Sequence, residues 1–163
     1  MTTEPAIFAE LRTLPADQFL LLKVLAPTVV GSNNRTLLHE AIAFRRTELM
    51  SYLIERGVPV NHQNNKGQTA LHYAAIYGSL TATQLLIESG ADPNICDMHG
   101  NNALWAALST HREPSIRVLL VRAGADATHK NKMGKSVLDF ARQSQNQELW
   151  VLCGGKEADF SLP

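Results

Sequence analysis

The chain has 163 residues, of which 45% are hydrophobic and 18% are charged, a composition far from that of disordered segments. Its 15 basic and 15 acidic residues cancel, which argues against nucleic acid or an anionic membrane as a partner. Only two cysteines are present, Cys96 and Cys153, without a CxxC pair, so a cytoplasmic protein is favoured over a disulfide scaffold.

Residues 1–30 are expected to form an N-terminal helical cap or a degenerate structural unit. Apolar residues at helical spacing in 7–11 and a second apolar run in 19–25, separated by Pro15, predict two short helices. The second run is shorter than the roughly 20 residues of a membrane-spanning helix, so a packed helix is predicted there. The first five residues include Glu4 but no Lys or Arg, so they lack the basic start of a secretory signal.

A seven-residue motif then recurs three times. TLLHEAI at residues 36–42 returns as TALHYAA at 69–75 and as NALWAAL at 102–108, in steps of 33 residues. A second motif recurs with nearly the same period: GVPVN at residues 57–61 returns as GADPN at 90–94 and as GADAT at 124–128, in steps of 33 and 34 residues. A unit of this length cannot bury its apolar face alone. The period therefore predicts an all-α solenoid of stacked helix-turn-helix units.

Turn signals precede each motif. Gly67, Gly100 and Gly134 each stand two residues before the polar residue that is expected to start a helix, and Asn34 takes this place in the first unit. Asparagine is a tolerated alternative to glycine at positive φ. Gly134 opens a fourth, divergent unit, GKSVLDFA.

The C-terminal part is expected to close the stack. Leu149, Trp150 and Leu152 predict a last apolar helix, and Gly154 and the glycine after it are expected to end that helix. Residues 156–163 are expected to form a loose tail.

The motifs resemble the ankyrin repeat, whose TPLHxAA opening and LLxxGADxN ending match residues 69–75 and 86–94. The proline is replaced in every unit, and Trp105 and Asp139 replace the histidine in the last two. The resemblance implies a protein-binding solenoid. Its expected parts are an N-terminal helical cap or degenerate repeat (1–30), ankyrin repeats (31–63, 64–96 and 97–130), a divergent C-terminal capping repeat (131–153) and a tail (154–163).

No catalytic, cofactor-binding or metal-binding residue is predicted. In ankyrin repeats the histidine of the opening motif ties adjacent turns by hydrogen bonds, so the resemblance gives His39 and His72 this role. Cys96 and His99 form only half of a possible zinc site, and His62 is the one other nearby candidate. The chain also lacks the phosphate-binding and nucleophile motifs of common enzyme families.

The resemblance places partner contacts on the concave face, beside each turn glycine and just after each opening motif. Carried over to this sequence, these positions are Arg35, Ala43, Phe44, Asn65, Lys66, Gln68, Ile76, Tyr77, Met98, His99, Asn101, Ser109, Thr110, Lys132, Met133 and Lys135.

Aromatic residues stand out among these positions. Phe44 and Tyr77 are one repeat apart and are predicted to form a single aromatic ladder, either exposed to a partner or packed into the stack. Arg45 and Arg46 place positive charge beside Phe44, which either meets a carboxylate or lies in solvent. Trp105 is predicted to be buried, because indole carries a large apolar surface.

Three classes of function were compared. A monomeric protein that inhibits or sequesters one protein partner is favoured, by resemblance to ankyrin proteins that regulate a kinase or neutralise a toxin. An adaptor that joins two protein partners is the alternative, and it predicts a second exposed patch on the convex side. An enzyme with an unrecognised site is disfavoured, because no catalytic constellation is found, and no small-molecule substrate is expected.

Overall fold

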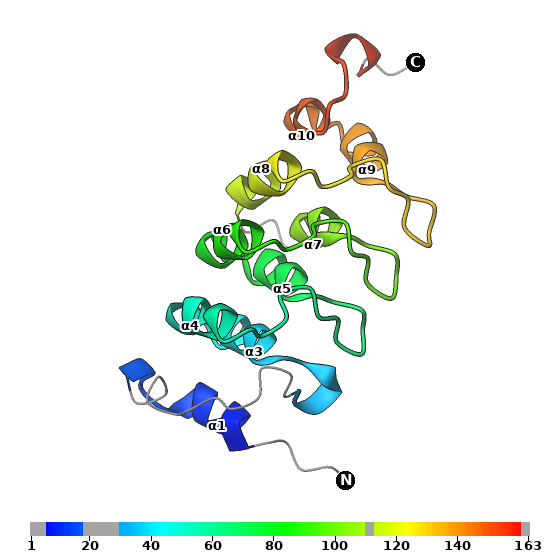
Figure 1. The fold of residues 1–163 in the computed structure, drawn as a ribbon. Helices are drawn as coiled ribbons and strands as arrows, with labels where there is room; N and C mark the ends of the chain where they lie inside the picture. The colour runs from blue at the N-terminus through cyan, green and yellow to red at the C-terminus, as the bar shows by residue number, and fades with distance from the viewer. Residues whose placement is uncertain (1–5, 18–29, 110–112, 161–163) are drawn as a thin grey trace.

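The computed structural model describes residues 6–17, 30–109 and 113–160 and places helices in pairs along one axis (Figure 1). The first helices of the pairs form one layer beside a row of hairpin loops, and the second helices form the other layer (Figure 1). No helix in these ranges is long and apolar enough to cross a membrane. The pairs are α3 (Leu37–Ala43) with α4 (Met50–Glu55), α5 (Ala70–Tyr77) with α6 (Leu80–Glu88), α7 (Ala103–Leu108) with α8 (Pro114–Arg122), and α9 (Val137–Gln143) with α10 (Gln147–Leu152).

The N-terminal end of the stack is covered by α1 (Ala6–Thr13), which packs against α3 with Phe8 and Leu11 fully buried. This confirms the first of the two short helices predicted there, whereas the second falls outside the described residues. A short 3-10 turn, η1 (Ser32–Asn34), then leads into the first unit.

The first helices begin where the polar residue of the motif caps them. Thr36, Thr69 and Ser136 each form a capping box, and Asn102 accepts a hydrogen bond from the backbone N–H of Trp105. These residues are extended, so the chain leaves the hairpin in β conformation and turns directly into the helix. The helix starts predicted from the motifs are therefore confirmed.

Left-handed residues form the turns before each first helix and, within the described residues, the turns after α3, α5 and α9. Asn34 has a φ of 58° and Gly67 one of 72°, as predicted for the turn before the helix. At the other end, Arg45 (φ 57°), Gly78 (φ 70°) and Gln145 (φ 55°) lead from the first to the second helix of their units. Because L-residues with side chains pay about 1–2 kcal/mol for this conformation, Arg45 and Gln145 occupy positions that favour glycine.

Small and branched apolar residues alternate through the stack. In α5, Leu71 faces the core with an exposed fraction of 1%, and Ala74 and Ala75 are equally buried. The alanines allow α5 to pack closely on α3, α6 and α7. The core is continuous from α1 to α10, as expected for units that bury their surfaces only against neighbours.

Two expectations for the C-terminal half are corrected. Residues 156–160 are not a loose tail, because Trp150 Nε1 donates to the Lys156 carbonyl at 2.9 Å and the Trp150 and Phe160 rings lie 5.8 Å apart. The 3-10 turn η3 (Glu157–Asp159) closes this contact. Trp105 is half-buried rather than buried, and its ring meets Phe140 edge-on at 6.3 Å.

Candidate functional site: the hairpin row and the ends of the first helices

Successive hairpins are joined by backbone hydrogen bonds. The N–H of Asn65 donates to the Asn33 carbonyl at 2.9 Å, that of Met98 to Lys66 at 2.8 Å, and that of Lys132 to His99 at 2.9 Å. The hairpins therefore form a continuous row along one side of the molecule (Figure 1). Because each hairpin is held by its neighbour, the side chains at the tips are presented at fixed spacing.

An Asn or Asp side chain closes each of three hairpins. The Oδ1 atom of Asn64 accepts from the N–H groups of Lys66 and Gln68. Asp97 and Asn131 each accept from the two equivalent N–H groups of their own hairpins. This role was missed in the sequence analysis, although an Asn or Asp recurring in steps of 33 and 34 residues three positions before each glycine was a usable signal.

The two motif histidines tie neighbouring units together, as predicted. His39 Nδ1 accepts from the Thr36 N–H at 3.2 Å, so its Nε2 carries the proton and donates to the Gln68 carbonyl at 3.0 Å. His72 repeats this arrangement one unit later with Asn101. Burial lowers the pKa of His39 to about 4 and also lowers the pKa of His72. Both imidazoles are therefore neutral structural groups at pH 7.

In the third unit Trp105 stands at the histidine position, and other side chains link the hairpins there. His129 lies 3.1 Å from the Gly100 carbonyl, and Asn131 Nδ2 donates to Asn101 Oδ1 at 2.9 Å. The Cys96 thiol lies 3.2 Å from His129 Nε2, so its imidazole neighbour is His129, and His99 of the C-x2-H pattern is not brought to it. Burial is the largest cause that raises the pKa of Cys96, which disfavours the reactive thiolate. Within the described ranges, no three His, Cys, Asp or Glu side chains gather as metal ligands.

Most of the predicted partner-binding positions are exposed. Five others are half-buried, namely Arg35, Ala43, Gln68, Ile76 and Asn101, and Thr110 lies outside the described residues. The exposed positions are Phe44, Asn65, Lys66, Tyr77, Met98, His99, Ser109, Lys132, Met133 and Lys135.

Three of the half-buried side chains make ion pairs, hydrogen bonds or apolar contacts within the protein itself. Arg35 Nε lies 2.9 Å from the buried carboxylate of Glu40. The same carboxylate forms an ion pair with Arg12, which belongs to α1. Asn101 is held by His72 and Asn131, and Ile76 packs against the core. These side chains offer less surface to a partner than their position in the motif implies.

The two predicted aromatic positions are exposed but have separate neighbours. Phe44 is 48% exposed, and the guanidinium of Arg12 lies 5.1 Å from its ring centre. Tyr77 is 38% exposed, and its ring lies 5.9 Å from that of Tyr73. Among the ring pairs of the described residues, Phe44 and Tyr77 are not paired. The surface thus holds two aromatic contacts at repeat spacing, in place of the continuous ladder predicted.

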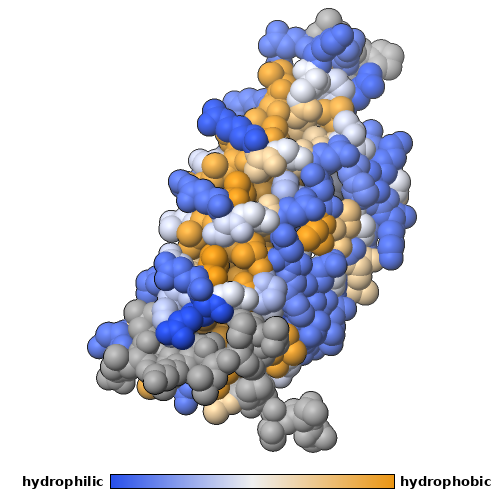
Figure 2. Space-filling view, in the orientation of Figure 1, coloured by the Kyte–Doolittle hydropathy of each residue, from blue (hydrophilic) through white to orange (hydrophobic). Residues whose placement is uncertain are grey.

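Charge is distributed unevenly between the two sides of the stack. The exposed hairpin side chains include Lys66, Lys132 and Lys135, whereas the carboxylate of Asp97 is engaged by its own hairpin. In Figure 2 hydrophilic residues predominate over the hairpin row, and an apolar band runs along the helical part of the same view. On the second helices the exposed charged residues include Glu55, Glu88, Arg122 and Glu148.

Comparison with known families matches this architecture. A family model for ankyrin repeats in three copies matches residues 14–97, about half of the chain. The match begins within the N-terminal segment that was expected to be a cap or degenerate repeat.

Curated relatives agree. A putative ankyrin repeat-containing protein of Treponema pallidum is 33% identical over 115 residues, which is 70% of this chain and 38% of that protein. The E3 ubiquitin-protein ligase KEG of Arabidopsis thaliana is 33% identical over 76% of this chain and 8% of its own length. Human ankyrin repeat domain-containing protein 63 is 34% identical over 59% of this chain and 26% of its own length. The chain thus spans less than half of each of these three relatives. With the family model matching half of the chain and a relative of 33% identity covering 70% of it, this protein belongs to the ankyrin-repeat family.

Proposed function

We propose that this protein binds one protein partner through the hairpin row and the ends of its first helices, and that binding inhibits or sequesters that partner. Ankyrin repeats are protein–protein interaction domains and are in general non-catalytic. The proposal includes a monomeric, cytoplasmic protein without a cofactor, a metal or a small-molecule substrate. An enzyme or a toxin is the kind of partner that such a blocking protein would take.

One observation carries the choice of surface. Among the described residues, the exposed large apolar side chains are Phe44, Tyr77, Leu80, Met98, Met133 and Val151. Four of these six belong to the ends of α3 and α5 or to the hairpin tips, where the exposed fraction reaches 80% for Met133. Phe44 and Tyr77 stand one repeat apart. Exposed aromatic and methionine side chains are typical of binding surfaces.

The adaptor remains the second candidate. It requires another contact surface, and the exposed Val151 on α10 lies beside an open pocket lined by Gln147, Glu148, Val151, Leu152 and Glu157. A blocking protein would form a one-to-one complex that abolishes the partner's activity. An adaptor would still bind a second protein after the first is in place.

Truncating the aromatic side chains is expected to weaken binding without unfolding the protein. Phe44→Ala and Tyr77→Ala should each cost about 2 kcal/mol of binding free energy, roughly a 30-fold loss of affinity, because aromatic anchors dominate such interfaces. The melting temperature should remain close to that of the wild type, since both side chains are substantially exposed. Affinity is measured by calorimetry with the partner captured from host lysate on the wild-type protein.

The capture itself needs a matched control. The double variant of Phe44 and Tyr77 serves as a second bait, and Val151→Ala removes an exposed apolar side chain from a second helix. A specific partner is retained by wild type and by Val151→Ala but lost by the double variant. Equal retention by all three baits, or a loss of several degrees in melting temperature without a loss of affinity, would overturn the assignment of this surface.

A further inference from the structure

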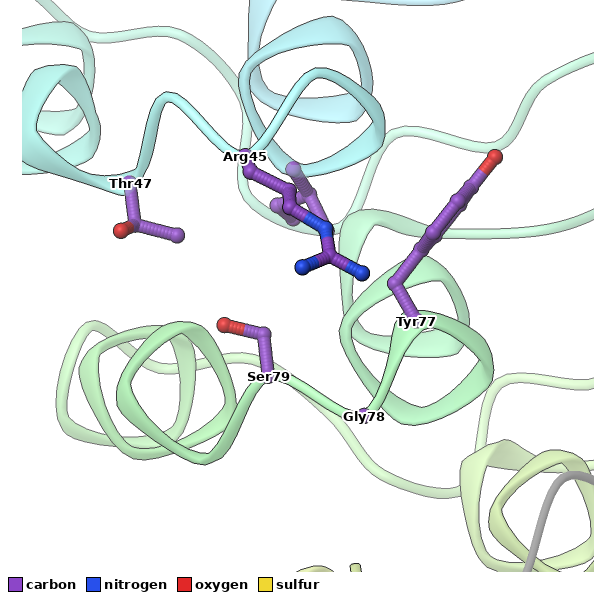
Figure 3. A pocket seen from close by; sticks show the side chains of 6 residues that line it. Arg45, Thr47, Tyr77, Gly78 and Ser79 are labelled. Carbon is purple, nitrogen blue, oxygen red and sulfur yellow. The ribbon is translucent and has the colours of Figure 1, made fainter. Parts of the chain in front are cut away.

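A pocket opens between the first and second repeats, where the first helices end. It has a volume of about 300 Å³ and is lined by Ile42, Arg45, Thr47, Tyr77, Gly78 and Ser79. Figure 3 shows the guanidinium group of Arg45 directed toward the turn at Gly78 and Ser79, with Thr47 on one side and Tyr77 on the other. The pocket therefore adjoins one of the two exposed aromatic positions.

Arg45 is the one strained and unpaired residue of this pocket. Its φ of 57° belongs to the region that favours glycine, and the equivalent residue of the next repeat is Gly78. Arg12, Arg35 and Arg46 are each paired with a carboxylate, whereas no described residue forms a hydrogen bond or ion pair with the Arg45 side chain. A cation kept at a position better suited to glycine, without an internal partner, is typical of a residue retained for binding.

The rest of the pocket adds further donors. Ser79 brings a hydroxyl group to its wall, whereas Thr47 turns its methyl group toward Arg45 (Figure 3). Ser79 caps α6, a nine-residue helix whose first N–H groups have no acceptor within the helix. The guanidinium, the Ser79 hydroxyl and this helix end all favour a negatively charged group. The exposed ring of Tyr77 supplies an apolar wall for the methylene groups of such a ligand, and Ile42, which is 1% exposed, lies behind the pocket.

We propose that this pocket receives the carboxylate of a glutamate side chain on the surface of the partner protein. The inference rests on the proposed function and specifies the chemistry of the partner at one point. A single guanidinium matches the single charge of a carboxylate, and the apolar wall fits the two methylene groups of glutamate. The exposed cations of the hairpin row, Lys66, Lys132 and Lys135, complement the same acidic surface.

The test uses a small probe, so that it does not depend on the identity of the partner. The amide and Arg45 Nε–H resonances of labelled protein are followed by NMR during titration with N-acetyl-glutamate N-methylamide. Saturable shifts at Gly78, Ser79 and Arg45, with a millimolar dissociation constant, are expected. The neutral glutamine analogue should shift these resonances at least about 10-fold more weakly, because it lacks the charge.

Arg45→Gly is the matched variant, because glycine adopts the left-handed conformation without strain and the backbone turn is retained. It should keep the wild-type melting temperature or exceed it, and it should lose the response to the glutamate probe. Arg45→Lys should retain part of the response, since it keeps the charge but not the bidentate geometry.

Several results would overturn the inference while leaving the proposed function intact. These are shifts that do not saturate, equal responses of wild type and Arg45→Gly, equal binding of the glutamine analogue, and tighter binding of blocked phosphoserine than of blocked glutamate. Unchanged affinity of Arg45→Gly for the captured partner would do the same. Failure of the proposed function would instead appear as equal retention by the baits described above, whatever the response to the probe.

Discussion

Gly67→Ala is expected to lower the free energy of unfolding by about 3 kcal/mol, the largest effect predicted for a single hairpin residue. A Cβ atom at Gly67 would lie 2.9 Å from the backbone N of Met98 and 3.0 Å from the carbonyl carbon of Asp97. Both atoms belong to the next hairpin, which the Met98 to Lys66 hydrogen bond holds in place. The clash adds to the strain of alanine at a φ of +72°.

Gly134 offers a control in which the strain is present without the clash. It has the same φ of +72°, and a Cβ atom there would meet nothing within 4 Å. Gly134→Ala should therefore lower the free energy of unfolding by only about 1 kcal/mol, the strain of the left-handed conformation alone. Urea unfolding of both variants and the wild type measures the difference. An equal decrease in unfolding free energy for the two variants would mean that the hairpins around Gly67 and Met98 lie farther apart than in this structure.

Amide hydrogen exchange adds a local measurement for Gly67→Ala. The Met98 N–H, which donates to the Lys66 carbonyl at 2.8 Å, should lose protection when the hairpins are pushed apart. Because Lys66 and Met98 are candidate contact residues, the same variant should also weaken partner binding. In Gly134→Ala, protection of the Met98 N–H should stay close to that of the wild type.

A fall in pH is expected to destabilise the protein through His39, by roughly 3 kcal/mol between pH 7 and pH 4. Burial lowers the pKa of His39 in the folded state from 6.5 to about 4, and the nearby His62 and Arg35 act in the same direction. The hydrogen bond to Gln68 opposes this shift. Between pH 6.5 and about pH 4, His39 binds a proton in the unfolded chain but stays neutral in the folded chain. The free energy of unfolding therefore decreases as the pH is lowered through this range, and it levels off once His39 is protonated in both states.

His39→Gln isolates this contribution. Glutamine does not titrate, and its amide retains a donor toward the Gln68 carbonyl. The difference in unfolding free energy between wild type and variant should therefore shrink, or change sign, as the pH falls from 7 to 4.5. His72, whose pKa is lowered by burial, leaves a residual slope in the variant. A constant difference across this range would show that His39 takes up its proton without loss of stability.

The sequence by itself determined the architecture, because every signal for it is local. Helix starts depend on a polar residue and the few residues after it, as at Thr69 and Ser136, and the turns depend on Gly67 or Asn34 at positive φ. The 33-residue period supplied the remaining information, because a repeated unit of this length buries its apolar face only against its neighbours. The resemblance likewise supplied the histidine ties, which recur unchanged at His39 and His72.

The tertiary structure decided which candidate residues are available for binding. Arg35 is a predicted contact position, and the sequence leaves open whether Arg45 meets a carboxylate or lies in solvent. Arg35 is paired with the buried Glu40, whereas no described residue pairs with Arg45 beside its pocket. Trp150 and Phe160 likewise meet only because the chain folds back on itself. These outcomes depend on side chains from separate units, or from separate ends of one unit, meeting at distances of a few ångströms. A repeat motif fixes the backbone of its own unit, whereas the neighbour's side chains decide what lies exposed between units.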